Sequence, residues 1–391
     1  MKFRLYLSIA GLISIIACDN TDPTDEYLPT DQIIIENTFG TNVNLNQPVN
    51  YRNSNVPAYI RFANTGNAID DQKALLGRIL FYDNNLSVDN TIACAGCHNQ
   101  ENAFSDTAIA SLGVNGFTGR HSMRLVNTGY QAGTSFFWDE RSSSLEHQVT
   151  QPIEDHIEMG FSGTDGNPTI DDLLTKLAAV DYYPVLFNHV YNDGVISEER
   201  LQECLSHFVL SIQSFDSKYD QGLAMAANPG QPFPNYSNSE NRGKQLFMTA
   251  PQNGGAGCVA CHAPPEFAIR DNSLNNGVIG SISNPSVFDH SNTRSPSLRD
   301  LVNPDGDLNG PLMHDGSFST LLEVIEHYNS IDPTNQQNID PILLRNGGPN
   351  GPQGQNLNLS NDDKIALVDF LRTLTGSDMY TNVKWSNPFI D

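Results

Sequence analysis

Apolar side chains recur at helical spacing in two segments of the first half of the chain. In residues 70–87, leucine and isoleucine occupy positions 75, 76, 79 and 80, and residues 197–215 place Leu201, Leu205 and Phe208 on one helix face. A helix of this kind buries its apolar stripe against a core. The pattern therefore predicts a helix in both segments, with Cys204 as a small buried hydrophobic residue in the second.

Start and stop signals mark two further helices. Thr169 with Asp172, and Ser360 with Asp363, have the spacing of a capping box, in which a hydroxyl and a carboxylate satisfy the free amides of a first turn. Gly376 follows the second of these segments and is a typical stop signal. Strand-like alternation is missing from the chain, and the long loops are rich in Gly, Asn and Pro. The predicted fold class is all-α with long irregular loops.

Composition divides the chain further. Residues 19–58 are rich in Asp, Asn, Thr and Pro without an apolar period, which predicts a flexible tether. The prolines and asparagines of residues 227–241 indicate a boundary between a first domain, 59–226, and a second domain, 227–391. The segment NRGKQLFM in the second domain echoes LGRILFYD in the first, so the two halves are interpreted as diverged copies of one unit.

Two CxxCH motifs carry the chemistry, one in each half. Two thiols on one helical turn can form thioethers to the vinyl groups of a haem, and the next histidine can then ligate its iron. Zinc is the alternative for a CxxC pair, but a zinc site would use both pairs together, and these are far apart in the sequence. The sequence therefore predicts two cytochrome c-type domains, each with one covalently bound c-type haem. The attachment residues are Cys94, Cys97 and His98 in the first motif, and Cys258, Cys261 and His262 in the second.

The amino terminus has the pattern of an export signal. Lys2 and Arg4 precede a 13-residue apolar stretch that is too short to span a bilayer. This stretch ends at Cys18 in a sequence that resembles the lipobox of bacterial lipoproteins. The resemblance implies a signal peptide over residues 1–18, lipidation of Cys18, and a periplasmic or outer-membrane lipoprotein of a Gram-negative bacterium. A plain signal peptide with a chance cysteine is the alternative.

Net charge limits the partners. The chain has 45 acidic and 21 basic residues and a formal charge of −24. Nucleic acid is excluded as the expected partner because phosphate binding needs a basic surface. The lipid anchor is the only predicted membrane contact. On a haem enzyme the charge suggests an acidic docking face for a basic electron donor, with simple solubility as the alternative.

The order of the motifs resembles the bacterial di-haem cytochrome c peroxidases and the related MauG-type di-haem oxygenases. In the first domain the matching segments are LGRILFYD, the first CxxCH, FFWDER, and the segment from Gln148 through Pro152 to Glu158 and Met159. In the second domain they are the second CxxCH, RSPSLR and MHDG. The resemblance covers roughly residues 70–375 and implies a two-domain fold with two haems.

The resemblance assigns roles at the first haem. Glu158 matches the distal glutamate of the peroxide-binding haem, with Pro152 beside it, and Trp138 matches a tryptophan that relays electrons between the haems. A carboxylate in this place can move a proton between the two oxygens of peroxide. Relatives often have a distal histidine in the segment corresponding to residues 110–120, which contains none here. We therefore predict that the first haem is open without reductive activation.

The second haem, the expected electron-entry site, departs from the peroxidase pattern. Its distal ligand is usually a methionine, but the matching position is Tyr328, as in MauG-type proteins. An anionic oxygen ligand stabilises ferric iron. Met313, His314 and His327 are the alternative ligands.

A calcium ion is a further cofactor that the resemblance suggests. Its ligands would be backbone oxygens near Asn309 and Pro311. Relatives usually have an asparagine near the ion, and His121 stands at that place here, which weakens the prediction.

Three functions are consistent with these residues. The first is a haem peroxidase that reduces hydrogen peroxide with electrons from a small redox donor such as a cytochrome c. The second is a MauG-type oxidase that uses peroxide equivalents on a protein or organic substrate, and Tyr328 favours it. The third, a pure electron carrier, is disfavoured by Glu158 and the missing histidine. Relatives of the peroxidase type are commonly dimers, so the resemblance also suggests a homodimer.

Overall fold

The computed structural model describes most of the chain. The leader, Cys18 and the start of the predicted tether lie outside the described residues, so the predictions for them are not tested by the structure. The described residues are 29–52, 56–60, 69–131, 133, 135–270, 272–284, 286–334, 337–345 and 353–390.

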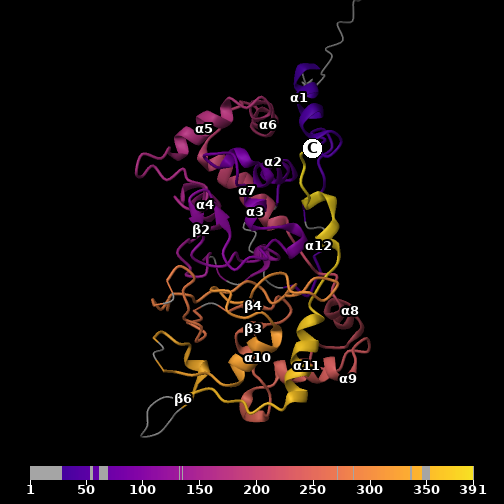
Figure 1. Cartoon of the computed structure of the whole chain (residues 1–391). Coiled ribbons are helices and arrows are strands. Elements are labelled where there is room, and N and C mark those ends of the chain that lie inside the picture. Colours follow the sequence, from indigo (N-terminus) through magenta and orange to yellow (C-terminus); the bar gives the residue numbers. More distant parts are fainter. Residues whose placement is uncertain are drawn as a thin grey trace, which may run out of the picture.

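Two lobes, each with its own hydrophobic core, are stacked end to end (Figure 1). The first lobe contains α1 (Pro29–Phe39), α2 (Asp71–Tyr82), α3 (Cys94–Cys97), β1 (Leu112–Gly113), β2 (Gly116–Phe117), α4 (Leu145–Glu154), α5 (Ile170–Ala178), α6 (Tyr182–Tyr191) and α7 (Glu198–Ser211). The second lobe contains α8 (Lys218–Met225), α9 (Asn238–Met248), β3 (His262–Ala263), β4 (Ala268–Ile269), α10 (Leu321–Asn329), β5 (Leu344–Arg345), β6 (Gln353–Gly354) and α11 (Asn361–Arg372). The last helix, α12 (Asp378–Thr381), lies beside the first lobe.

Helices form the framework, and the described strands make only three antiparallel pairs of two residues each. The helix-rich fold agrees with the predicted class. Among the described residues, no helix is both long and apolar enough to cross a membrane. Cys204 is fully buried in α7, as predicted.

The four helices predicted from patterns and caps are present as α2, α5, α7 and α11. At α5, Thr169 and Asp172 make both contacts of the capping box. At α11, the Ser360 hydroxyl accepts a hydrogen bond from the Asp363 amide at 3.1 Å. Gly376 does not stop this helix, which ends at Arg372; instead its amide donates to a buried carboxylate, 2.9 Å from Asp300 Oδ1.

The internal repeat is visible as two equivalent helix crossings. α2 packs against α7 in the first lobe, and α9 packs against α11 in the second. A Cβ added at Gly77 would lie 1.9 Å from the Cys204 carbonyl oxygen, and one added at Gly243 would lie 1.8 Å from that of Ala366. Both glycines therefore allow the backbones of the crossing helices to touch, which supports the interpretation of two diverged copies.

The predicted tether is wrong for its described part. Residues 29–39 form α1, and Ile35, Phe39 and Tyr51 are buried in the first core. The carboxyl-terminal tail covers the same region: Trp385 is fully buried in this core, and the Ile390 amide donates to the Thr38 carbonyl at 3.2 Å. The first and last described segments thus stabilise each other on the first lobe (Figure 1).

The two hydrophobic cores place the domain boundary earlier in the sequence than predicted. Ile212 belongs to the first core and Tyr219, in α8, belongs to the second, so the chain changes lobe before residue 227. Trp385 lies in the first core although it follows the whole second lobe in sequence. The division at 226/227 is therefore displaced by about one helix, because a proline-rich loop inside the second lobe resembles a linker in composition.

Candidate active site

The first CxxCH motif forms α3, a single helical turn, and His98 follows it directly. Neither cysteine forms a disulfide bond within the described residues. The His98 Nδ1 atom lies 3.0 Å from the Phe104 carbonyl oxygen, which is turned back by left-handed backbone at Ala103 and Phe104 (φ 57° and 58°). Only a protonated Nδ1 can donate to a carbonyl, so Nε2 keeps its lone pair for a metal. Burial lowers the pKa of His98 and favours this neutral form.

The second motif repeats this arrangement in the other lobe. Cys258 begins the short helix η5 (Cys258–Ala260), Cys261 directly follows this helix, and His262 lies in β3 opposite Ile269 of β4. Burial lowers the pKa of His262 to about 4, and the nearby Phe267 carbonyl opposes this effect. The imidazole is therefore neutral at neutral pH, as a metal ligand must be. Unlike His98 Nδ1, the buried Nδ1 of His262 has no hydrogen-bond partner among the described residues.

A cavity of about 850 Å³ adjoins the second motif. Ligand and cofactor sites commonly measure about 300–1,000 Å³ and are mostly apolar. The size, the two cysteines of the motif and the neutral histidine fit a covalently attached haem. The lining includes Phe247, Met248, Leu298, Leu301, Leu312, Met313, Val324, Ile325, Tyr328, Leu367 and Leu371, together with Cys258, Cys261 and His262.

Tyr328, on α10, lines this cavity. Its hydroxyl accepts a hydrogen bond from Asn276 Nδ2 at 3.1 Å. Burial raises the pKa of Tyr328 to about 12, while the Asn276 bond lowers it and the nearby thiols of Cys261 and Cys258 raise it. The phenol oxygen thus lies among the haem-attachment residues, and Asn276 is a donor that the sequence did not reveal.

The alternative ligands differ in what their side chains contact. His314 Nε2 lies 2.8 Å from the Gly280 carbonyl, and His327 Nε2 lies 2.9 Å from the Asn276 carbonyl. Each histidine therefore has one ring nitrogen engaged by the backbone. Met313 lines the cavity with Tyr328, and its sulfur is 3.5 Å from Asn276 Nδ2.

Glu158 lies near the first motif. Its amide donates to Asp155 Oδ1 at 3.0 Å, and its carboxylate makes no hydrogen bond with any residue that the structure describes. Burial, followed by the negative charge of Asp155, raises the pKa of Glu158 to about 7, and Arg141 opposes this. Burial raises the pKa values of Cys94 and Cys97, and the negative charge of Glu158 raises them further. The Glu158 carboxylate is therefore close enough to interact electrostatically with both cysteines.

The backbone around Glu158 is held by the β1–β2 hairpin. Its carbonyl accepts from the Val114 amide at 3.0 Å. Gly113 is required here because a Cβ would lie 2.1 Å from the Ile157 carbonyl oxygen. Pro152, which the resemblance places beside Glu158, lies inside α4 and is half-buried.

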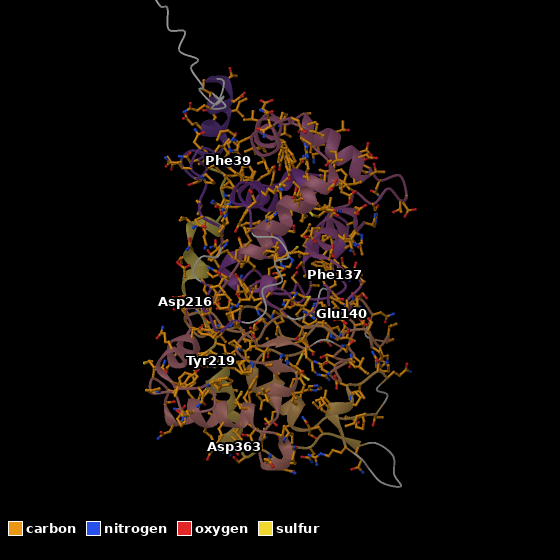
Figure 2. The ribbon with its side chains drawn as sticks, turned by 180° about the vertical axis from the view of Figure 1, so that it is seen from behind. Phe39, Phe137, Glu140, Asp216, Tyr219 and Asp363 are labelled. Carbon is orange, nitrogen blue, oxygen red and sulfur yellow. The ribbon has the colours of Figure 1, made fainter. Side chains whose placement is uncertain are left out.

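Trp138 lies where the two lobes meet. Its indole nitrogen donates to the His121 carbonyl at 2.8 Å, and its own carbonyl accepts from the amides of Thr293 and Arg294. Its ring centroid is 6.2 Å from that of His314. Figure 2 labels the neighbouring residues Phe137 and Glu140 at this junction; both have left-handed backbone, with φ of 69° and 56°. The predicted relay residue therefore contacts both halves and lines the second cavity.

Asn309 and Pro311, the residues of the predicted calcium site, have other contacts in the structure. The Asn309 amide donates to the Asp300 carbonyl and to Tyr380, both at 2.8 Å, which leaves one buried oxygen of this side chain without a partner. Pro311 lines the second cavity. His121 Nδ1 lies 3.0 Å from the Ala108 carbonyl. The described part of the chain contains no cluster of three or more His, Cys, Asp or Glu side chains suited to a metal ion.

Comparisons with known proteins agree with the two-site arrangement. Residues 71–228 match the family model for di-haem cytochrome c peroxidase. The chain is 30% identical over 272 residues to the methylamine utilization protein MauG of Methylorubrum extorquens, covering 67% of this chain and 70% of that protein. It is 25% identical over 321 residues to the cytochrome c551 peroxidase of Nitrosomonas europaea, covering 78% and 80%.

A solved structure has the same fold. A MauG-like protein associated with microbial copper homeostasis superposes with a TM-score of 0.64 at 25% identity, over 86% of this chain and 99% of that one. The family implies haem c as the cofactor. The chain therefore belongs to the di-haem cytochrome c peroxidase and MauG family of oxidoreductases that act on peroxide.

Proposed function

We propose that the protein reduces hydrogen peroxide at the site formed by Cys94, Cys97, His98 and Glu158. When bound, the haem supplies the iron and the redox chemistry. The observation that carries the proposal is the Glu158 carboxylate, which lies near the first motif, is free of hydrogen bonds within the described residues and has a pKa of about 7. Beside the second motif, Asp340 lines the cavity, but its carboxylate is bonded to Arg270 Nη2 at 2.8 Å.

Glu158 moves the proton in this proposal. As a carboxylate it accepts a proton from one oxygen of peroxide, and as a carboxylic acid it delivers that proton to the departing oxygen. A pKa near neutrality suits a group that must do both. The overall reaction consumes one peroxide, two electrons and two protons and forms two water molecules. Burial keeps His98 neutral, and the Phe104 carbonyl at Nδ1 leaves Nε2 as the unprotonated nitrogen.

Electrons would enter at the second site and pass through Trp138. The tryptophan lines the second cavity and is hydrogen-bonded to the first-lobe residue His121, so it contacts both sides of the junction. The donor would be a small redox protein such as a cytochrome c, and the charge of −24 favours a basic one. Export, lipid attachment at Cys18 and a homodimer complete the proposal.

Tyr328 supports a second candidate, the MauG-type oxidation of a protein or organic substrate. Its phenol oxygen lies in the second cavity beside Asn276. An oxygen ligand would favour the ferric state and hinder electron uptake from a donor. The second site would then share oxidising equivalents with the first instead of delivering electrons to it.

Stopped-flow mixing of the two-haem protein with peroxide separates these candidates. Rapid oxidation of a reduced cytochrome c supports the peroxidase. An oxidised spectral state that persists without donor turnover supports the MauG-type reaction. Absence of any reaction with peroxide would contradict both and leave electron transfer as the function.

A further inference from the structure

Arg124 belongs to the first half of the chain, yet it lines the cavity of the second CxxCH motif. Its Nη2 atom donates to the Ser297 carbonyl at 3.0 Å. Its Nε atom is buried and has no hydrogen-bond partner among the described residues. The guanidinium therefore presents unused donors, Nε among them, in a cavity that is lined mostly by the second lobe.

No described carboxylate forms an ion pair with Arg124. Burial lowers the pKa of its guanidinium to about 10, which Asp300 and Tyr380 partly oppose through space. The group is still a cation at neutral pH. Asp300 accepts a hydrogen bond from the Gly376 amide through Oδ1 at 2.9 Å, and its buried Oδ2 has no hydrogen-bond partner among the described residues. A buried cation without a bonded anion is unfavourable, and such groups normally pair with a carboxylate or phosphate.

The repeat shows that this cation is specific to one site. The Leu125 amide donates to the Phe104 carbonyl at 3.3 Å, and the Leu298 amide donates to the Phe267 carbonyl at 3.1 Å. Leu125 and Leu298 are therefore equivalent, and so are the residues before them, Arg124 and Ser297. Ser297 is neutral and its hydroxyl donates within its own lobe, to the Glu266 carbonyl at 2.8 Å. The first half thus places a positive charge in the cavity of the second lobe, whereas the equivalent residue of the second half, Ser297, is uncharged.

The chemistry of the expected cofactor supplies the missing anion. A haem carries two propionate carboxylates, and the Nε and Nη donors of an arginine match a carboxylate in a two-point contact. We propose that Arg124 binds a propionate of the haem attached at Cys258 and Cys261, so that the first lobe completes the second haem site. Bound in this way, the cation stabilises the reduced haem, which has one positive charge less at its iron than the oxidised haem.

The test is the reduction potential of each haem in the holoprotein, measured by spectroelectrochemistry. Arg124→Leu removes the charge, Arg124→Lys keeps the charge without the two-point contact, and Arg372→Leu removes an exposed arginine of the second lobe as the matched control. We expect Arg124→Leu to shift the reduction equilibrium of the second haem at least tenfold toward the ferric form, or 59 mV for one electron. Arg124→Lys should show a smaller shift, and the first haem should change less than the second.

Two results would overturn the proposal: unchanged potentials in Arg124→Leu with both haems retained, or an equal shift in Arg372→Leu. Selective loss of the second haem from Arg124→Leu would support it, whereas equal loss of both haems would contradict it. The inference rests on haem at the second motif. A haem count on the wild-type protein, with Cys258→Ala and Cys261→Ala, tests that assignment separately.

Discussion

The two lobes repeat one helix crossing and one turn of two thiols and a histidine, but they surround that turn differently. Beside the first motif lies Glu158, a carboxylate with a pKa of about 7 on a short loop held by a hairpin. Beside the second lies a cavity of about 850 Å³ that is lined by Tyr328 and Arg124. A duplicated unit has thus acquired a group suited to proton transfer in one copy and groups suited to tuning a potential in the other.

The largest expected effect comes from removing the acid–base group of the first lobe. Glu158→Gln should slow peroxide reduction about 10²- to 10⁴-fold, the usual contribution of a positioned general acid–base. Stopped-flow peroxide consumption measures this. Glu154→Gln, an exposed carboxylate on the preceding helix, is the matched control. An unchanged rate in Glu158→Gln would show that Glu158 does not transfer the proton, and would contradict the proposed functional difference between the lobes.

The pH profile sharpens the same assignment. The carboxylate form of Glu158 accepts the first proton, and its pKa is raised to about 7, so activity should rise with pH through this value. From pH 6 to pH 8 the ionised fraction, and with it the rate, should increase roughly tenfold. Steady-state peroxide consumption measures the profile. A flat wild-type profile, or the same inflection in Glu158→Gln, would assign the titration to another group.

The shared helix crossing predicts equal sensitivity of the two lobes to packing. Gly77→Ala and Gly243→Ala each place a methyl carbon within 1.9 Å of a backbone carbonyl oxygen of the crossing helix. Each should lower the free energy of unfolding by about 1–3 kcal/mol or more, as overpacked sites do. Urea denaturation measures the loss, with Gly119→Ala as control because no atom lies within 4 Å of its added Cβ. Destabilisation by only one variant would show that the crossings are not equivalent.

A smaller effect is expected at the second site. Tyr328→Met should raise the potential of the second haem by at least 59 mV, a tenfold change for one electron, because a thioether favours ferric iron less than a phenolate does. Spectroelectrochemistry measures the change. Met313→Leu should leave the potential and spectrum of this haem unaltered. The reverse pattern would make Met313 the ligand.

Local patterns were sufficient for much of this molecule. The helices α2, α5, α7 and α11 follow from apolar spacing and caps within each segment, and the haem motifs are short and contiguous. The described part of the tether was missed because Phe39 packs against Phe389, with ring centroids 5.1 Å apart, and a partner so distant in the sequence leaves no local period. For the same reason no pattern in the sequence around Arg124 indicates that it lines the cavity of the other lobe.

Electron paramagnetic resonance of the oxidised two-haem protein tests the central claim, that the two sites differ in kind, most directly. The β1–β2 hairpin and the rest of residues 110–120 contain no histidine to close the first site, whereas Tyr328 lies in the second cavity. The account predicts one high-spin signal, from an open first haem, and one low-spin signal, from a six-coordinate second haem. A spectrum with low-spin, six-coordinate iron alone would contradict it.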